Sequence, residues 1–183
     1  EFELVEKQKF SIRKLRAIEG VMITQGKKTE AIKLENTDAN KATNQSRQIY
    51  SKIPGLNIWE SDGAGIQLGL GGRGLSPTRT SNYNTRQNGY DISADALGYP
   101  ESYYTPPSEA IDEIQIIRGA ASLQFGPQFG GLINFKLKDG NPNKKLELIA
   151  RHTVGSFGLN NTFLSVGGKI NNWSYFTYGN YKF

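Results

Sequence analysis

The sequence has no cysteine and a single histidine, His152, among its 183 residues. Without thiols there is no disulfide scaffold, thiolate metal site or cysteine nucleophile, and a Ser-His-Asp triad would have to use His152. This histidine lies in the segment LELIARHTV, whose pattern predicts a strand, so we interpret it as an ordinary strand residue. We therefore expect no enzyme, no metal site and no cofactor. Enzymatic chemistry would need Asp91, Asp95 and Glu101 to converge in one pocket, and we expect them on separate turns.

The sequence also lacks a long apolar run, a signal peptide and a strong excess of charge. It contains 22 Lys and Arg against 17 Asp and Glu, which gives a net charge of +5. The basic residues are scattered and form no basic helix or RNA-binding aromatic motif, so we expect no nucleic-acid partner. No apolar run approaches the roughly 18–20 residues that a membrane helix needs. The sequence starts without Met and stops within an aromatic-rich pattern, so we expect a fragment of a longer protein.

What the sequence does contain is a succession of short elements separated by glycine and proline. Residues 35–55 predict a helix that ends at a Pro-Gly pair, and residues 56–60 predict a strand. Residues 75–107 are polar and turn-rich, and a loop of this length is usually functional or disordered. Two further strands are predicted at 114–118 and 132–138.

The stretch IQLGLGGRGLSP, residues 66–77, has the G-x-G-x-x-G spacing of a dinucleotide-binding loop. Such a loop needs a helix that starts at its third glycine, but here Pro77 follows and no apolar helical stripe comes after it. We therefore interpret the glycines as positions where backbones approach closely. Arg73 lies among them, and a second Arg-Gly pair begins at Arg118. Such arginines are either solvated or held at an interface by carboxylate partners.

The pattern changes in residues 146–183, which predict strands of roughly ten residues joined by short turns. Alternation places one set of side chains of the last strand on one face: Trp173, Tyr175, Thr177, Gly179, Tyr181 and Phe183. The other face carries Ser174, Phe176, Tyr178, Asn180 and Lys182. Alternating strands of about 9–11 residues with aromatic girdles are typical of a membrane β-barrel. A soluble sandwich gives a similar pattern, and we favour the barrel.

Three blocks of residues resemble, in order and spacing, the plug domain of TonB-dependent outer-membrane receptors. They are Ile53-Pro54-Gly55-Leu56, Gly72-Arg73-Gly74-Leu75 and the block AIDEIQIIRGAASLQFGPQFGGLINF at 110–135. The Gly-Pro-Gln before the Gly-Gly pair is most similar to the ferric citrate (siderophore) receptor branch. The resemblance implies an α+β plug domain followed by the antiparallel β-strands of a truncated outer-membrane β-barrel, which in this family has about 22 strands.

The resemblance also implies a division of the chain into segments. We expect the end of an N-terminal extension at 1–18, a TonB-box-like segment at 19–26, the plug domain at 27–142 and the first barrel strands at 143–183. A TonB box pairs as an added strand with the periplasmic energy-coupling protein. The residues expected to form this contact are Glu19, Gly20, Val21, Met22, Ile23 and Thr24. The alternative is that this segment is the first strand of the plug itself.

The implied function is TonB-dependent import of a ferric chelate, ferric citrate or another siderophore, across the bacterial outer membrane. The plug would lie in the barrel lumen, with the TonB box facing the periplasm and lipid around the barrel. Because the plug must be unseated, we expect polar contacts between plug and barrel. Two alternatives stay open. One is a TonB-dependent importer of another cargo, such as a glycan or cobalamin, and the other is a soluble binding module with a plug-like fold.

The site residues expected from this resemblance fall into two groups. Arg73 and Arg118 are candidates for contacts to barrel carboxylates outside this chain segment. A loop at 76–87 is the candidate ligand contact, with charge and hydrogen-bonding groups for an anionic chelate from Arg79, Asn82, Asn84, Arg86 and Gln87. The chelate would be held through its organic shell, so no residue is expected to bind the metal. The sequence departs from the family at Gln115, where a Glu is common, and Asp112 or Glu113 are possible substitutes.

Overall fold

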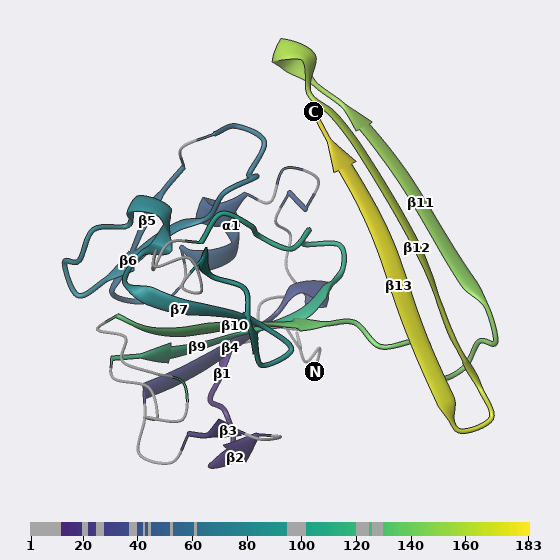
Figure 1. The fold of residues 1–183 in the computed structure, drawn as a ribbon, viewed down its shortest axis with the longest axis horizontal. Helices are drawn as coiled ribbons and strands as arrows, with labels where there is room; N and C mark the ends of the chain where they lie inside the picture. Colours follow the sequence, from purple (N-terminus) through teal and green to yellow (C-terminus); the bar gives the residue numbers. More distant parts are fainter. Residues whose placement is uncertain are drawn as a thin grey trace, which may run out of the picture.

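The fold consists of an N-terminal region built on a mixed sheet and a long C-terminal sheet that stands beside it (Figure 1). The structure is a computed structural model. It describes residues 12–19, 22–24, 28–36, 40–41, 43, 45–51, 53–60, 62–94, 102–119, 125 and 130–183. None of the helices in these ranges is long and apolar enough to cross a membrane.

The main sheet has six strands in the order β1-β4-β9-β10-β7-β8. The strands are β1 (Ile12–Arg13), β4 (Lys28–Lys33), β7 (Tyr83–Gln87), β8 (Tyr90–Asp91), β9 (Ile111–Arg118) and β10 (Gly131–Leu137). Neighbouring strands are antiparallel except β10 and β7, which are parallel. The predicted strands at 114–118 and 132–138 are the central pair β9 and β10, and β9 begins three residues earlier than predicted.

The two faces of β9 bury different kinds of side chain because successive residues of a strand point to opposite faces. Ile114 and Ile116 join the larger apolar core, which also contains Tyr83. On the opposite face Ile117 belongs to a smaller core cluster. That face continues along the strand with two buried polar side chains, Glu113 and Gln115, and this polar strip becomes important for the site below.

Two small hairpins flank the main sheet. One joins β2 (Ile18–Glu19) and β3 (Met22–Ile23), and the other joins β5 (Leu56–Trp59) and β6 (Gly69–Gly72). The predicted strand at 56–60 is therefore confirmed as β5.

The predicted helix at 35–55 is wrong in extent. Among the residues described in this range, the structure has a short 3-10 turn, η1 (Leu34–Asn36), and one helical segment, α1 (Ser46–Tyr50). The apolar stripe of α1 consists of Ile49 and Tyr50, and Gln45 provides no side-chain cap, so little stabilises a longer helix. The expectation of one long loop at 75–107 is also wrong, because it contains β7 and β8.

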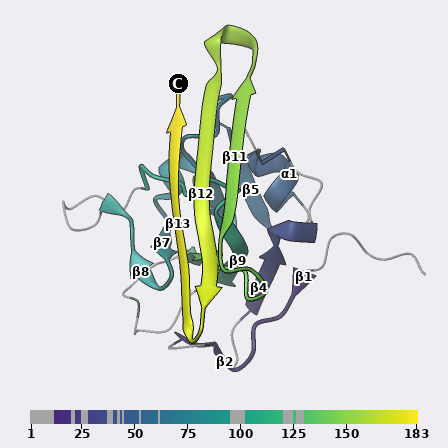
Figure 2. The same cartoon turned by 90° about the vertical axis from the view of Figure 1, so that its right-hand side faces the viewer.

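The C-terminal sheet has three antiparallel strands, β11 (Glu147–Val154), β12 (Asn160–Ile170) and β13 (Trp173–Lys182). A one-turn 3-10 segment, η5 (Ser156–Gly158), joins the first two. Figures 1 and 2 show this sheet as one layer that covers one side of the N-terminal region. The sequence predicted these strands and their approximate lengths.

Candidate functional site

The glycine-rich stretch serves close packing, as predicted, and not nucleotide binding. A Cβ atom added to Gly72 would lie 2.3 Å from the hydroxyl oxygen of Tyr83. Arg73 and Gly74 follow with positive φ angles of 56° and 77° in a tight turn, closed by the N–H of Leu75 donating to the Gly72 carbonyl at 3.0 Å. A strand leads into a turn here, and no helix N-terminus is available for a pyrophosphate.

The two arginines of the Arg-Gly pairs have different surroundings. Arg118 donates to the Glu30 carboxylate at 2.6 Å and to the Pro54 carbonyl at 2.5 Å. The carboxylate partner of Arg118 within this segment is therefore Glu30, on β4 of the same sheet. Arg73 is exposed, and its guanidinium lies against Gly119, where an added Cβ would be 2.7 Å from Nη2.

Of the segment predicted to be the TonB box, residues 19–26, the structure describes residues 19 and 22–24, and Glu19, Met22 and Ile23 lie in the β2–β3 hairpin beside the main sheet. Glu19 pairs with Met22 across the hairpin, and Gly20 and Val21 lie outside the described residues. The Met22 side chain is buried in the smaller core cluster, whereas Ile23 is 57% exposed. Thr24 is buried and its hydroxyl donates to the carbonyl of Arg16. The segment is thus a separately seated hairpin and not a strand of the main sheet.

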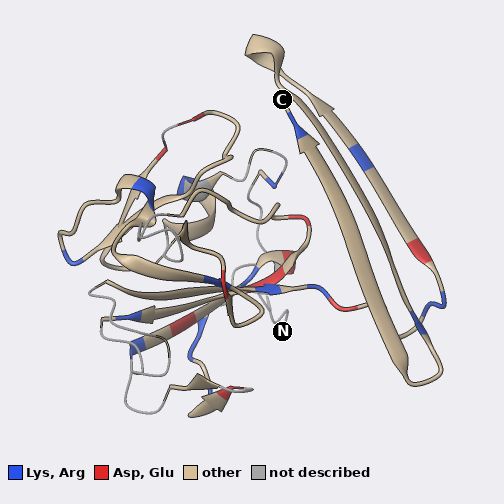
Figure 3. Ribbon diagram, viewed as in Figure 1, with Lys and Arg blue, Asp and Glu red and all other residues tan. Residues whose placement is uncertain are grey.

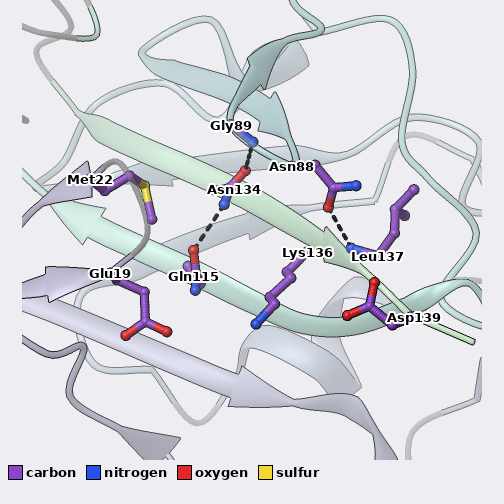
Figure 4. A pocket seen from close by; sticks show the side chains of 9 residues that line it. All are labelled: Glu19, Met22, Asn88, Gly89, Gln115, Asn134, Lys136, Leu137 and Asp139. Atoms are coloured by element: carbon purple, nitrogen blue, oxygen red, sulfur yellow. Dashed lines mark hydrogen bonds between the residues drawn. The ribbon is translucent and has the colours of Figure 1, made fainter. Parts of the chain in front are cut away.

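A cavity of about 410 Å³ lies between this hairpin and the main sheet (Figure 4). The hairpin, strands β9 and β10, and the β7–β8 turn all contribute to its walls. The lining residues are Glu19, Met22, Asn88, Gly89, Gln115, Asn134, Lys136, Leu137 and Asp139. Six of these nine residues have polar side chains, so the cavity can hold water and hydrogen-bonding solutes.

A chain of side-chain hydrogen bonds runs along one wall of the cavity. The backbone N–H of Gly89 donates to Asn134 Oδ1 at 2.8 Å, and Asn134 Nδ2 donates to Gln115 Oε1 at 2.9 Å. Gln115 Nε2 in turn donates to the Glu113 carboxylate at 2.9 Å. All three side chains are buried, so each bond replaces a hydrogen bond to water.

An ion-pair cluster continues this chain to the hairpin. Arg13 holds Glu113 with two hydrogen bonds of 2.8 and 3.0 Å and reaches Glu19 at 3.3 Å. Burial disfavours the charged form of Glu19, but the hydrogen bond and charge of Arg13 outweigh it and hold the pKa of Glu19 below its ordinary value. Glu113 pairs with Arg13 and not with Arg73 or Arg118.

The five predicted ligand-contact residues separate into two sets. Arg79 lies in the 3-10 turn η2 (Thr78–Thr80), and its guanidinium carbon is 5.5 Å from the centre of the Tyr103 ring. Arg79 also donates to the Tyr103 hydroxyl at 3.4 Å. Asn82 donates to the Ser76 carbonyl in the same turn region. No sequence pattern points to Tyr103, because it is 24 residues away from Arg79 in a segment without a recognisable motif.

The other three, Asn84, Arg86 and Gln87, lie on strand β7 and not on a loop. Asn84 is 3% exposed and donates to Asp91 at 2.7 Å. Arg86 donates to Asn84 Oδ1 and to the Gly89 carbonyl, both at 2.6 Å, and its guanidinium carbon lies 4.7 Å from the Phe125 ring centre. These polar groups stabilise the β7–β8 turn from within the main sheet.

Asp91 belongs to this internal network. Burial disfavours its charged form, but hydrogen bonds from Ser93 and Asn84 and the charge of Arg86 hold the pKa of Asp91 below its ordinary value. Asp95 and Glu101 lie outside the described residues. Within the part of the chain that the structure describes, no three His, Cys, Asp or Glu residues are grouped so that they could hold a metal ion.

The N-terminal region and the C-terminal sheet are joined by polar contacts. The hydroxyls of Tyr104 and Tyr178 are 3.1 Å apart, Arg151 donates to Glu109 at 3.1 Å, and Lys182 donates to the Ala64 carbonyl. A second cavity of about 280 Å³ lies in this seam, lined by Asn88, Leu137, Lys138, Asp139, Phe176, Thr177 and Tyr178. Three of these residues, Asn88, Leu137 and Asp139, also line the cavity behind the hairpin.

The opposite face of the C-terminal sheet is apolar and exposed. Its large exposed side chains are Leu148, Val154, Leu164, Ile170, Trp173 and Tyr181. Trp173 lies at the end next to the β12–β13 turn and Tyr181 near the other end, so aromatic rings occur at both ends of the sheet. Figure 3 shows long uncharged stretches on β12 and β13. The predicted division of the last strand into two faces is consistent with its register to β12.

Comparisons with known proteins agree with this arrangement. The family model described as "TonB-dependent Receptor Plug Domain" matches residues 22–132, more than half of the chain. The unliganded ferric citrate transporter FecA is 24% identical, with a TM-score of 0.62 over 87% of this chain and 26% of its own length. The ferric preacinetobactin receptor BauA from Acinetobacter baumannii is 20% identical, with a TM-score of 0.62 over 87% of this chain and 23% of its own.

The copper transporter OprC is also similar, with 18% identity and a TM-score of 0.58 over 88% of this chain and 24% of its own length. The chain thus spans about a quarter of the length of these proteins. The expected fold class, an α+β plug domain followed by antiparallel strands of a partial barrel, is confirmed. The chain belongs to the TonB-dependent receptor family and contains its plug domain.

Proposed function

We propose that this chain is the plug and the first barrel strands of a receptor that imports a ferric chelate across the bacterial outer membrane. One observation carries the proposal: a plug fold is joined to a sheet with an apolar outer face and a polar inner seam. An apolar face with aromatic rings at both ends fits lipid. A polar seam fits a plug that must move, because exchanging protein hydrogen bonds for water costs less than exposing an apolar interface.

The β2–β3 hairpin is the proposed contact for a TonB-type energy-coupling protein. It is held by few bonds, it has two-residue strands, and its Ile18 and Ile23 side chains are 68% and 57% exposed. A short strand with exposed apolar side chains is suited to pairing with an added strand of a partner. The residues proposed for this contact remain 19–24.

We propose fewer ligand-contact residues than the sequence analysis did. Arg79 and Asn82 lie in the turn region before β7, where Arg79 is stacked beside Tyr103. A guanidinium and a phenol side by side can bind the carboxylate or catecholate oxygens of a chelate shell. We no longer propose Asn84 and Arg86 as ligand contacts. Their polar groups already form hydrogen bonds within the main sheet, so their proposed role is structural. Arg73, which is exposed, is the remaining candidate for a barrel carboxylate.

A non-iron cargo is the main alternative, because a copper transporter has a similar fold. Glycans and cobalamin are further alternative cargoes. A soluble plug-like binding module is less consistent with the exposed apolar face of β11–β13.

Uptake in whole cells tests the proposal. Iron-limited cells that carry or lack the full receptor gene would be supplied with radioactive iron, either as ferric citrate or as another ferric siderophore complex. Parallel cultures would be supplied with copper. We expect receptor-dependent accumulation of iron from one chelate, abolished when the energy-coupling protein is deleted. Receptor-dependent accumulation of copper and not of iron would mean that the cargo is copper and not a ferric chelate. Recovery of the native polypeptide from the soluble fraction at about the mass of this segment, 20.3 kDa, would refute the transporter proposal.

A further inference from the structure

We propose that Thr80 is a positioning residue: its buried hydroxyl fixes the backbone of the turn η2 and thereby aims the Arg79 guanidinium at Tyr103. The inference deepens the proposed function and rests on it where Arg79 is treated as a contact for an anionic chelate. Its structural part concerns the plug alone. The basis is an unusual backbone conformation beside a buried hydroxyl.

The turn η2 contains two successive residues in the left-handed region of backbone conformation. Arg79 has a φ angle of 48° and Thr80 a φ angle of 54°. Neither residue is glycine, and Thr80 is β-branched, so this conformation is costly for both. Such strain persists only where the surrounding contacts outweigh it. The contacts that these two residues make must therefore hold the turn in place.

The Thr80 hydroxyl makes two such contacts, both with the start of β6. It donates to the Leu68 carbonyl at 2.6 Å and accepts from the Leu70 N–H at 3.2 Å. Thr80 and Leu70 are 0% exposed and Leu68 is 2% exposed, so losing the hydroxyl would leave two buried backbone groups without this partner. One side chain thus ties the strained turn to the strand on either side of Gly69.

The same backbone conformation determines where Arg79 points. Its side chain is exposed, and its guanidinium carbon lies 5.5 Å from the centre of the Tyr103 ring. The Arg79 carbonyl accepts from the N–H of Ser102 at 2.9 Å, which brings the segment that contains Tyr103 beside the turn. In the right-handed region the side chain and the carbonyl of Arg79 would leave the turn in other directions. The buried hydroxyl of Thr80 therefore controls an exposed guanidinium.

This arrangement prepares the turn for an anionic chelate. A guanidinium held beside a phenol offers hydrogen-bond donors to carboxylate or catecholate oxygens from a fixed direction. A side chain that is already held in its bound orientation loses less conformational entropy when the ligand arrives. Thr80 should therefore raise the affinity for the chelate, although its own side chain is buried.

Fluorine NMR of the full-length receptor tests the positioning without any cargo. Tyr103 alone is replaced by a ring-fluorinated tyrosine, and Arg79→Gln defines the resonance of a ring without its guanidinium. We expect Thr80→Val, which removes the hydroxyl, to move the resonance to the Arg79→Gln position. Thr80→Ser, which keeps the hydroxyl, should retain the wild-type resonance. Thr78→Val makes the same chemical change at an exposed position of the same turn and is the matched control.

Binding of ferric citrate measures the consequence for the ligand. A hydrogen bond to a charged group contributes enough that its loss weakens binding by about tenfold. We expect the Kd to rise about tenfold in Thr80→Val and in Arg79→Gln. The double variant should lose no more than either single variant, because both remove the same contact. Thr80→Ser should bind as the wild type does.

Two results would overturn the inference. One is an unmoved fluorine resonance in the folded Thr80→Val receptor, which would mean that the Ser102 hydrogen bond alone places Arg79. Thr80→Ala removes the hydroxyl in a smaller side chain and decides the same point if Thr80→Val does not fold. The other is a double variant whose losses of affinity add. A resonance that moves as expected in a receptor that imports no ferric chelate refutes the proposed function alone. Iron import with an unmoved resonance refutes this inference alone.

Discussion

At the scale of single residues, buried polar and charged groups in the plug pair across large sequence distances. Glu30 pairs with Arg118 over 88 positions, and Arg13 pairs with Glu113 over 100. Glu113 is 1% exposed, so hydrogen bonds to protein groups take the place of nearly all the hydrogen bonds that its carboxylate would make to water. Removing one member leaves the other partly desolvated, which costs more than the pair itself contributes.

Glu30→Gln should therefore destabilise the plug. Arg118 would keep its hydrogen bond to the Pro54 carbonyl but lose its carboxylate partner. For this partly buried pair we expect the free energy of unfolding to fall by about 1–2 kcal/mol. Chemical unfolding of the full receptor in detergent, followed by tryptophan fluorescence, measures the change. Glu35→Gln, at an exposed position, is the control. Equal stability of the two variants would mean that Arg118 finds another partner.

Gly72 provides a second residue-scale prediction. Gly72→Ala places a Cβ 2.3 Å from the Tyr83 hydroxyl oxygen, so it should destabilise the plug by about 1–3 kcal/mol. Tyr83→Phe removes that oxygen and should restore part of the loss in the double variant. Gly63→Ala, where an added Cβ meets nothing within 4 Å, is the matched control. The steric interpretation fails if the two alanine variants unfold at the same denaturant concentration.

At the scale of elements, the β2–β3 hairpin is the weakly held part of the plug. Its strands have two residues each, and the bonds that seat it are few. Met22 contributes its buried side chain, and Arg13 contributes the ion pair to Glu19. Elements with little buried area and few hydrogen bonds open at low free-energy cost. This is the property that a releasable segment requires.

Acid should loosen the hairpin through Glu19. Because its pKa is lowered in the seated state, the ion pair stabilises seating at neutral pH, and this stabilisation is lost as the pH falls through that lowered pKa. We expect the mobile fraction of a spin label at Ile23→Cys to rise between about pH 7 and about pH 3. In Glu19→Gln the rise should be smaller and the neutral-pH mobility higher. An identical pH profile in both proteins would show that the effect does not come from Glu19.

At the scale of the whole molecule, the C-terminal sheet separates two environments. Its inner face contacts the plug through tyrosine hydroxyls, an arginine and a lysine, whereas its outer face presents aliphatic and aromatic side chains. Leu164 is 51% exposed and lies near the middle of β12, and Ile170 is 51% exposed at its end. If lipid covers this face, the cost of a charge should depend on depth.

Leu164→Arg and Ile170→Arg test this dependence with the same chemical change at two depths. In the membrane-embedded receptor we expect Leu164→Arg to cost about 2–4 kcal/mol and Ile170→Arg about 0–1 kcal/mol. The fraction of heat-modifiable folded receptor in a denaturant series measures both. Equal costs at the two positions would argue against a lipid-facing sheet.

Local sequence patterns account for the features that depend on neighbouring residues. The alternation of β11–β13, the isoleucine-rich strand β9 and the close approach at the glycine stretch all follow from period-two patterning and from the missing Cβ of glycine. Such signals are local, and they were sufficient for the fold class and the family.

Which polar side chains pair with one another depends instead on how the strands come together on folding. Strand β7 has a polar sequence and becomes a strand because it pairs in parallel with β10, which begins more than forty residues later. The partners of Arg118 and Arg13, and the amide chain through Gln115 and Asn134, likewise depend on strands brought together by folding. A side chain's partner is set by the register of distant strands, which no local pattern in this sequence encodes.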